Sequence, residues 1–85
     1  MPSPAIDAFV DALWLEDGLS VNTLAAYRRD LVAFEQWLAQ TGKTLDDAKG
    51  LDVLSWQAQE HQLTKASTAN RRLATLRRYY RWARR

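Results

Sequence analysis

The 85-residue sequence predicts an all-α fold, a compact bundle of four helices that forms one domain over residues 1–85. Two observations lead to this prediction. Apolar residues recur at helical spacing in four segments, which glycines or polar stretches separate. No segment alternates apolar and polar residues as a half-buried strand would. Hydrophobic residues make up 47% of the chain and include four tryptophans, so a core is feasible in so short a chain.

The first helix is predicted over residues 4–17. Ser3 and Pro4 form a start signal of a hydroxyl cap followed by a first-turn proline, and Gly18 is a natural stop. The apolar stripe consists of Ile6, Phe9, Val10, Leu13 and Trp14. The other side carries the acids Asp7, Asp11, Glu16 and Asp17, so this side is expected to face away from any phosphate backbone.

The second helix is predicted over residues 21–41, between the cap Ser20 and Gly42. Its apolar stripe consists of Leu24, Tyr27, Leu31, Phe34 and Leu38. Trp14 and Trp37 lie on or beside the two stripes, so both are expected in the core. The opposite side of the second helix carries small and polar residues, which allow another surface to approach closely.

The remaining two helices follow a loop with a predicted turn at Asp46-Asp47. A short third helix is expected over residues 51–60, with Val53, Leu54 and Trp56 as its apolar residues. Thr64 or Ser67 is the expected cap of a fourth helix that runs from about residue 68 to the end. The fourth apolar stripe consists of Ala69, Leu73, Leu76, Tyr80 and Ala83, and Trp82 is expected to pack against the first or second helix.

Charge divides the chain sharply. Residues 1–60 carry four cations and ten acids, whereas residues 61–85 carry eight cations and no acid. The band of arginines opposite the fourth stripe comprises Arg71, Arg77, Arg78, Arg81, Arg84 and Arg85, and Arg72 lies nearer the apolar edge. Like charges at helical spacing repel, so we expect an anionic partner, with phosphate best suited to the donor fork of arginine. Arg71 is expected to be free, so that Arg71→Ala would leave the melting temperature nearly unchanged.

Several kinds of chemistry find no support. The chain has no cysteine, a single histidine (His61) and no phosphate loop or paired carboxylates, so we expect no cofactor, metal, small-molecule substrate or catalysis in these residues. No signal peptide or membrane span is apparent, which predicts a cytoplasmic location. Three partners stay open for the basic helix: a DNA duplex, an acidic protein, and an anionic membrane surface.

Two stretches resemble one known family. The run D-A-L-W-L-E-D-G-L-S-V-N-T-L-A-A-Y-R-R-D-L (residues 11–31) looks like the start of Xer-type tyrosine recombinases, most closely the XerD subgroup. The run S-T-A-N-R-R-L-A-T-L-R-R-Y-Y-R-W (residues 67–82) is similar to the last main helix of the same N-terminal domain. Phage and integron integrases share the looser outline. The resemblance implies a SAM-like core-binding domain.

In this family the core-binding domain forms half of a clamp around double-stranded DNA, and its second and fourth helices approach the major groove of a recombination half-site. The resemblance therefore implies DNA contacts from Thr23, Ala26 and Arg29 and from Ser67, Thr68, Arg71 and Arg78. Asn22, Lys65 and Asn70 complete the predicted set. Arg71, near the start of the fourth helix, is expected to read a base, and Arg81, Arg84 and Arg85 to contact the backbone or nothing.

The chemistry of the family lies in a separate C-terminal domain whose motifs do not occur in this sequence. The resemblance thus implies a non-catalytic fragment of a longer recombinase, in which Tyr27, Tyr79 and Tyr80 are not the nucleophile. Xer proteins act as tetramers on two DNA sites. They resolve chromosome dimers, which links them to chromosome partition and cell division, or they integrate DNA elements. Their N-terminal domains touch neighbouring protomers in the synapse, and these protomers are the expected protein partners.

Overall fold

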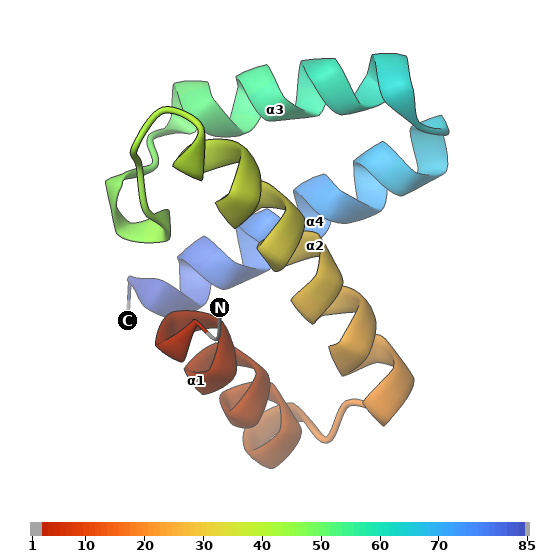
Figure 1. Cartoon of the computed structure of the whole chain (residues 1–85). Coiled ribbons are helices and arrows are strands. Elements are labelled where there is room, and N and C mark those ends of the chain that lie inside the picture. Colours follow the sequence, from red (N-terminus) through yellow and green to blue (C-terminus); the bar gives the residue numbers. More distant parts are fainter. Residues whose placement is uncertain (1–2, 85) are drawn as a thin grey trace.

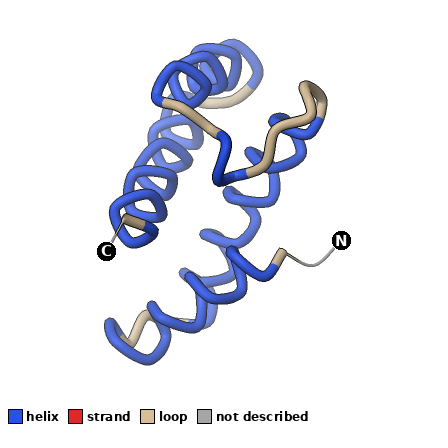
Figure 2. The backbone as a smooth tube through the Cα atoms, turned by 90° about the vertical axis from the view of Figure 1, so that its left-hand side faces the viewer, coloured by secondary structure: helices blue, strands red, loops and turns tan. Residues whose placement is uncertain are grey.

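The computed structural model describes residues 3–84 and confirms the all-α fold, because these residues form four α-helices and no strand (Figure 2). The elements are α1 (Pro4–Ala12), a π turn η1 (Leu13–Asp17), α2 (Val21–Ala39), a 3-10 turn η2 (Leu45–Asp47), α3 (Gly50–Leu63) and α4 (Ala66–Ala83). Arg85, expected in the arginine band, lies outside the described residues, as do Met1 and Pro2.

The helices form two hairpins that cross each other. A short connection joins α1 to α2, another joins α3 to α4, and α2 passes over the middle of α4 (Figure 1). The core lies where the hairpins meet, and its large buried side chains come from every helix. They are Ile6, Phe9, Leu13, Leu24, Leu31, Phe34, Leu38, Leu45, Trp56, Leu76 and Tyr79.

The ends of the first two helices follow from local sequence. Gly18 (φ 62°) and Gly42 (φ 74°) adopt the left-handed conformation that lets the chain leave a helix. The Ser20 hydroxyl accepts a hydrogen bond from the backbone N–H of Thr23 at 3.2 Å, which confirms Ser20 as the cap of α2. The predicted 4–17 segment is helical throughout, whereas α2 ends at Ala39, two residues before the predicted end.

The third helix is longer than the sequence predicted. It begins at Gly50 and continues to Leu63, three residues beyond the expected end. Asp52 supplies the start signal of α3, because its carboxylate accepts a hydrogen bond from the Lys49 N–H at 2.8 Å. This bond, with the Lys43 ammonium at 3.0 Å, lowers the pKa of Asp52. The predicted turn before α3 is confirmed as η2.

The fourth helix begins at Ala66, and Lys65 occupies the cap position, so the prediction of Thr64 or Ser67 as its cap was wrong. The Thr64 hydroxyl instead donates a hydrogen bond to the Glu60 carbonyl at the end of α3.

The buried face of α4 is rotated from the predicted stripe. Leu73 and Tyr80 are only half-buried and Ala83 is exposed, whereas Tyr79 and Thr75 are buried. The reason is polar, since Thr75 turns inward to donate a hydrogen bond to a buried carboxylate on α2. Tyr80 still reaches the η2 loop, where its hydroxyl donates to the Leu45 carbonyl at 2.8 Å.

The tryptophans divide between core and surface. Trp82 packs against Phe9 of α1, with ring centroids 5.5 Å apart, as predicted. Trp37 is half-buried and stacks on Phe34. The prediction that Trp14 lies in the core was wrong, because this residue is 52% exposed. At about 100° per residue, Trp14 projects well to one side of Ile6, Phe9 and Leu13, which centre the buried face of α1.

Candidate nucleic-acid interface

The arginines of α4 fall into two sets. Arg71, Arg72 and Arg78 form ion pairs with acids of other elements. Arg77 and Arg81 are exposed and form no ion pair within residues 3–84. Carboxylates elsewhere in the fold therefore offset part of the repulsion along the helix, so an anionic partner is not needed to neutralise Arg71, Arg72 and Arg78.

Asp30 of α2 is the centre of the first set, and its side chain has no exposed surface. Arg71 donates to both carboxylate oxygens, from Nη2 to Oδ1 at 2.6 Å and from Nε to Oδ2 at 3.2 Å. The Thr75 hydroxyl donates to Oδ2 at 2.9 Å. The hydrogen bond to Asp30 raises the pKa of Arg71, so the guanidinium stays charged. Arg71 is thus not the free surface residue that the sequence predicted.

Arg72 extends this arrangement to α3. Its Nη1 donates to the Glu60 carboxylate, and its buried Nε lies 3.5 Å from Asp30 Oδ1 without forming a hydrogen bond. Its guanidinium also lies 5.9 Å from the Trp56 ring centroid. We call Asp30, Glu60, Arg71, Arg72 and Thr75 the buried charge cluster. Its formal charges balance, and it links α2, α3 and α4.

Neither acid of the buried charge cluster was predicted to be buried, although the spacing of both acids from apolar residues indicates the core-facing side of their helices. Asp30 follows Tyr27 by three residues and precedes Phe34 by four, so it lies on the core-facing side of α2. Glu60 follows Trp56 by four residues. An acid at core spacing is almost always paired when buried, and a neighbouring helix rich in arginine offers the pair.

A second ion pair lies at the other end of the α2–α4 contact. Arg78 Nη2 lies 2.5 Å from Asp17 Oδ2, and the guanidinium lies 5.9 Å from the Tyr27 ring centroid. The hydrogen bond to Asp17 raises the pKa of Arg78. Asp17, which was expected on the side of helix 1 that faces away from DNA, lies beside Arg78, a predicted DNA-contacting arginine.

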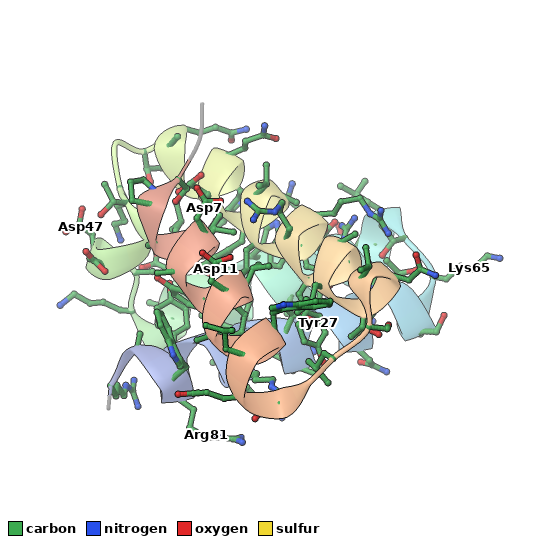
Figure 3. All side chains as sticks on the ribbon, turned by 90° about the horizontal axis from the view of Figure 1, so that it is seen from below. Asp7, Asp11, Tyr27, Asp47, Lys65 and Arg81 are labelled. Atoms are coloured by element: carbon green, nitrogen blue, oxygen red, sulfur yellow. The ribbon has the colours of Figure 1, made fainter. Side chains whose placement is uncertain are left out.

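The other acids of α1 differ from Asp17. Asp7 forms an ion pair with Arg28 of α2. Asp11 is exposed and forms no ion pair among residues 3–84. Figure 3 shows Asp7 and Asp11 along α1, well separated from Lys65. The outer face of α1 is therefore partly neutralised within the fold.

The predicted contact residues of α2 are accessible to different degrees. Asn22 and Arg29 are exposed, whereas Thr23 and Ala26 are half-buried. The Thr23 hydroxyl oxygen accepts a hydrogen bond from the Ser20 hydroxyl at 3.0 Å. Tyr27 and Asp30 of α2 contact α4. Thr23 precedes Tyr27 by four residues and Ala26 precedes Asp30 by four, so both lie on the same face of α2, close to the α2–α4 contact.

The predicted contact residues of α4 and its cap position fall into two groups. Arg71 and Arg78 lie seven residues apart on one face, and each contacts α2. Lys65, Ser67 and Asn70 are exposed and Thr68 is half-buried. Within residues 3–84 the side chains of these four form no hydrogen bond or ion pair with α2. Lys65 points outward from the turn before α4, at the far end from Arg81 (Figure 3). The structure thus joins two of the predicted residues to α2 and leaves the rest on exposed turns.

Residues 3–84 offer neither a metal-binding cluster nor a membrane-spanning helix. No group of three His, Cys, Asp or Glu side chains there is arranged to hold a metal ion. His61 lies exposed in the last turn of α3. None of the helices in the same range has the length and apolar character needed to cross a membrane.

Comparison with known proteins places the chain in a family. Residues 6–85 match the family described as "Phage integrase, N-terminal SAM-like domain". The chain is similar to proteins named "Tyrosine recombinase XerD" from Ralstonia nicotianae (53% identical, 93% of this chain) and Shewanella oneidensis (47%, 91%), in each case over 26% of the relative. Another relative of that name, from Pseudomonas aeruginosa, is 46% identical over 93% of this chain and 27% of its own length.

This chain therefore spans about a quarter of the length of the curated relatives it matches. No solved structure was found to match it. The matching family model covers nearly all of the chain, and the four-helix fold agrees with it. The chain belongs to the family of phage integrase N-terminal SAM-like domains.

Proposed function

We propose that this chain is the DNA-binding module of a site-specific tyrosine recombinase whose catalytic residues lie in a domain outside these 85 residues. The relatives named tyrosine recombinase, of which the chain covers about a quarter, support this proposal. The observation that carries it is the surface of α4, where the exposed Arg77 and Arg81 have no ion pair within residues 3–84. Unpaired arginines on one helix suit a run of phosphates.

In the proposed complex, α2 and α4 approach the major groove together. Arg29, Arg77 and Arg81 contact phosphates, which position the module without reading sequence. The remaining predicted contact residues lie near the helix starts, where unpaired backbone N–H groups also attract phosphate. They are Asn22, Thr23 and Ala26 on α2, the cap residue Lys65, and Ser67, Thr68 and Asn70 on α4. Arg71 reads a base, because a bidentate arginine–guanine contact discriminates between base pairs. Arg78 contacts DNA once it is released from Asp17.

Membership of the family supports a proposal for the biological setting. The full recombinase acts in the cytoplasm as a tetramer on two DNA sites, in chromosome dimer resolution or in the integration of DNA elements. This module contributes part of the DNA clamp and touches neighbouring protomers. It carries no catalytic residue and takes no cofactor or small-molecule substrate.

Salt dependence tests the DNA-binding proposal. Fluorescence anisotropy with a labelled mixed-sequence duplex should show binding that weakens steeply as salt rises, with a log–log slope of about −0.9 per neutralised phosphate. The double variant Arg77→Ala/Arg81→Ala should reduce this slope by about two, if each arginine neutralises one phosphate. Asp11→Asn on α1 is the control and should leave the slope unchanged. Binding that is independent of salt would contradict the proposal.

A second candidate function rests on a groove between the start of α3 and the C-terminal half of α4. Its volume is about 560 Å³, and Val53, Leu54 and Leu73 are among its apolar lining residues. The cations that line it are Lys49, Arg77, Arg81 and Arg84, and no acid does. Such a groove suits an acidic helix with apolar side chains. Leu54→Ala, which changes no charge, should weaken binding of such a peptide and leave DNA binding nearly unchanged.

A further inference from the structure

The position of Asp30 is unusual for a charged residue near a DNA-binding surface. Among the described residues it is the only charged side chain with no exposed surface, and it lies beneath a predicted DNA-contacting arginine. An acid close to DNA repels phosphate. The proposed function therefore does not by itself explain why an acid should occupy this position.

The geometry of the Arg71–Asp30 pair is informative. A guanidinium has five N–H donors in a rigid planar fork. Asp30 engages the side edge of the fork, through Nε and one N–H of Nη2. The end edge, made by Nη1 and the second N–H of Nη2, has no hydrogen bond within residues 3–84. The Arg71 side chain is 47% exposed, so this edge is open to a ligand.

Asp30 is itself held firmly. The Thr75 hydroxyl donates to Oδ2, and Arg72 Nε lies 3.5 Å from Oδ1. Because the carboxylate is fixed by two helices, the two bonds that it accepts from Arg71 restrict the torsion angles of a long, flexible side chain. A side chain ordered before binding loses less entropy when the complex forms.

We propose that Asp30 is a positioning residue, which holds Arg71 so that its Nη1–Nη2 edge is presented to the O6 and N7 acceptors of a guanine in the major groove. This inference rests on the proposed DNA-binding function and deepens it. Asp30 does not touch DNA; it acts through Arg71. Two parallel N–H donors at the end of a fixed guanidinium match the two acceptors that guanine presents there.

The direction in which Asp30→Asn changes the affinity for DNA separates this role from a simple charge effect. Asp30→Asn removes one negative charge near the DNA surface while keeping the shape of the side chain. Through charge alone, the substitution should strengthen DNA binding. If Asp30 positions Arg71, the substitution should weaken it, because the amide keeps one acceptor oxygen and opposes its own N–H donors to those of arginine. The two explanations predict opposite changes.

The experiment compares four forms of the 85-residue chain on a labelled mixed-sequence duplex at low salt: wild type, Asp30→Asn, Arg71→Ala and the double variant. Binding is measured where thermal melts show each form fully folded. We expect Asp30→Asn to weaken binding on the order of two- to tenfold, the cost of ordering one long side chain. In the Arg71→Ala background the same substitution should weaken binding no further. Asp17→Asn is the charge-matched control and should strengthen binding.

A base-selection experiment with a random-sequence duplex pool supplies a readout that a structural role would not move. Guanine preference at one position should disappear in Asp30→Asn and in Arg71→Lys, which keeps the charge but loses the fork. If Asp30→Asn does not fold, Thr75→Val removes one hydrogen bond to the carboxylate and should give a smaller change in the same direction.

Several results would overturn the inference. They are equal or tighter DNA binding by Asp30→Asn, an equal loss in both Arg71 backgrounds, or a guanine preference that survives the substitution. If the proposed DNA-binding function is itself wrong, the wild-type chain will not bind the duplex, and this result is distinct from those three. The Arg71 Nε–H NMR signal gives a test without DNA: it should be protected from exchange in wild type and lose protection in Asp30→Asn. An unprotected signal in wild type would refute the positioning role.

Discussion

Arg71→Ala tests whether the buried charge cluster stabilises the fold. The substitution removes two hydrogen bonds, of 2.6 and 3.2 Å, from a carboxylate that has no exposed surface. Breaking a buried ion pair from one side costs about 3–5 kcal/mol. Because Arg71 is itself 47% exposed, water can replace part of the lost contact. Thr75 and Arg72 also remain beside Asp30.

We therefore expect Arg71→Ala to reduce the free energy of unfolding by about 2–3 kcal/mol, below the full range for a buried pair. For a domain of this size, the melting temperature should fall by about 8–24 °C. Urea titrations and thermal melts followed by circular dichroism measure both quantities. Arg77→Ala is the matched control, because Arg77 lies exposed on the same helix without an ion pair in the described residues. It should change stability by less than about 0.5 kcal/mol. Equal effects of the two substitutions would refute a stabilising role of the Arg71–Asp30 ion pair.

Three further predictions concern packing, acid stability and charge release. Leu31→Ala should destabilise by about 2–5 kcal/mol because Leu31 is fully buried, and Leu73→Ala by clearly less because Leu73 is half-buried, as urea titrations will show; equal losses would contradict the burial pattern. The folded-state pKa of Asp52 is lowered by the Lys49 N–H and then by Lys43, so this stabilisation is complete above the unfolded value of about 3.9 and is lost as pH falls through the folded value. Unfolding midpoints of Asp52→Asn should therefore change less between about pH 5 and about pH 2 than those of wild type. Asp17→Asn should release Arg78 and tighten duplex binding in anisotropy titrations with little change in melting temperature, since the pair is exposed; weaker binding would argue against a DNA contact by Arg78.

The sequence predicted the helices better than the faces they bury. Periodicity located all four helices. Gly18, Ser20 and Gly42 also marked the boundaries of the first two, because these residues act locally and their effect can be read from neighbouring residues. The end of α3 and the start of α4 were misplaced by two or three residues. There the signal is the Thr64 hydroxyl, which donates to the Glu60 carbonyl and closes α3.

The candidate site shows a different limit. Arg71 and Arg78 were correctly placed off the main apolar stripe, yet their ion-pair partners lie 41 and 61 residues away in the sequence. Periodicity within one helix carries no information about such partners. The single available signal was an acid at core spacing in α2, and Asp30 supplies it. The same buried acid draws Thr75 inward and rotates α4, which explains why Tyr79 replaces Tyr80 in the core.

We propose that α2 and α4 together form the DNA-binding face. A backbone-amide NMR titration of the chain with a duplex, at low salt, tests it most directly. We predict the largest shifts in the first turns of α2 and α4 and at Arg77 and Arg81, with Asp7 and Asp11 of α1 nearly unchanged. Shifts concentrated on α1 or α3 would contradict this account, even if the domain binds DNA.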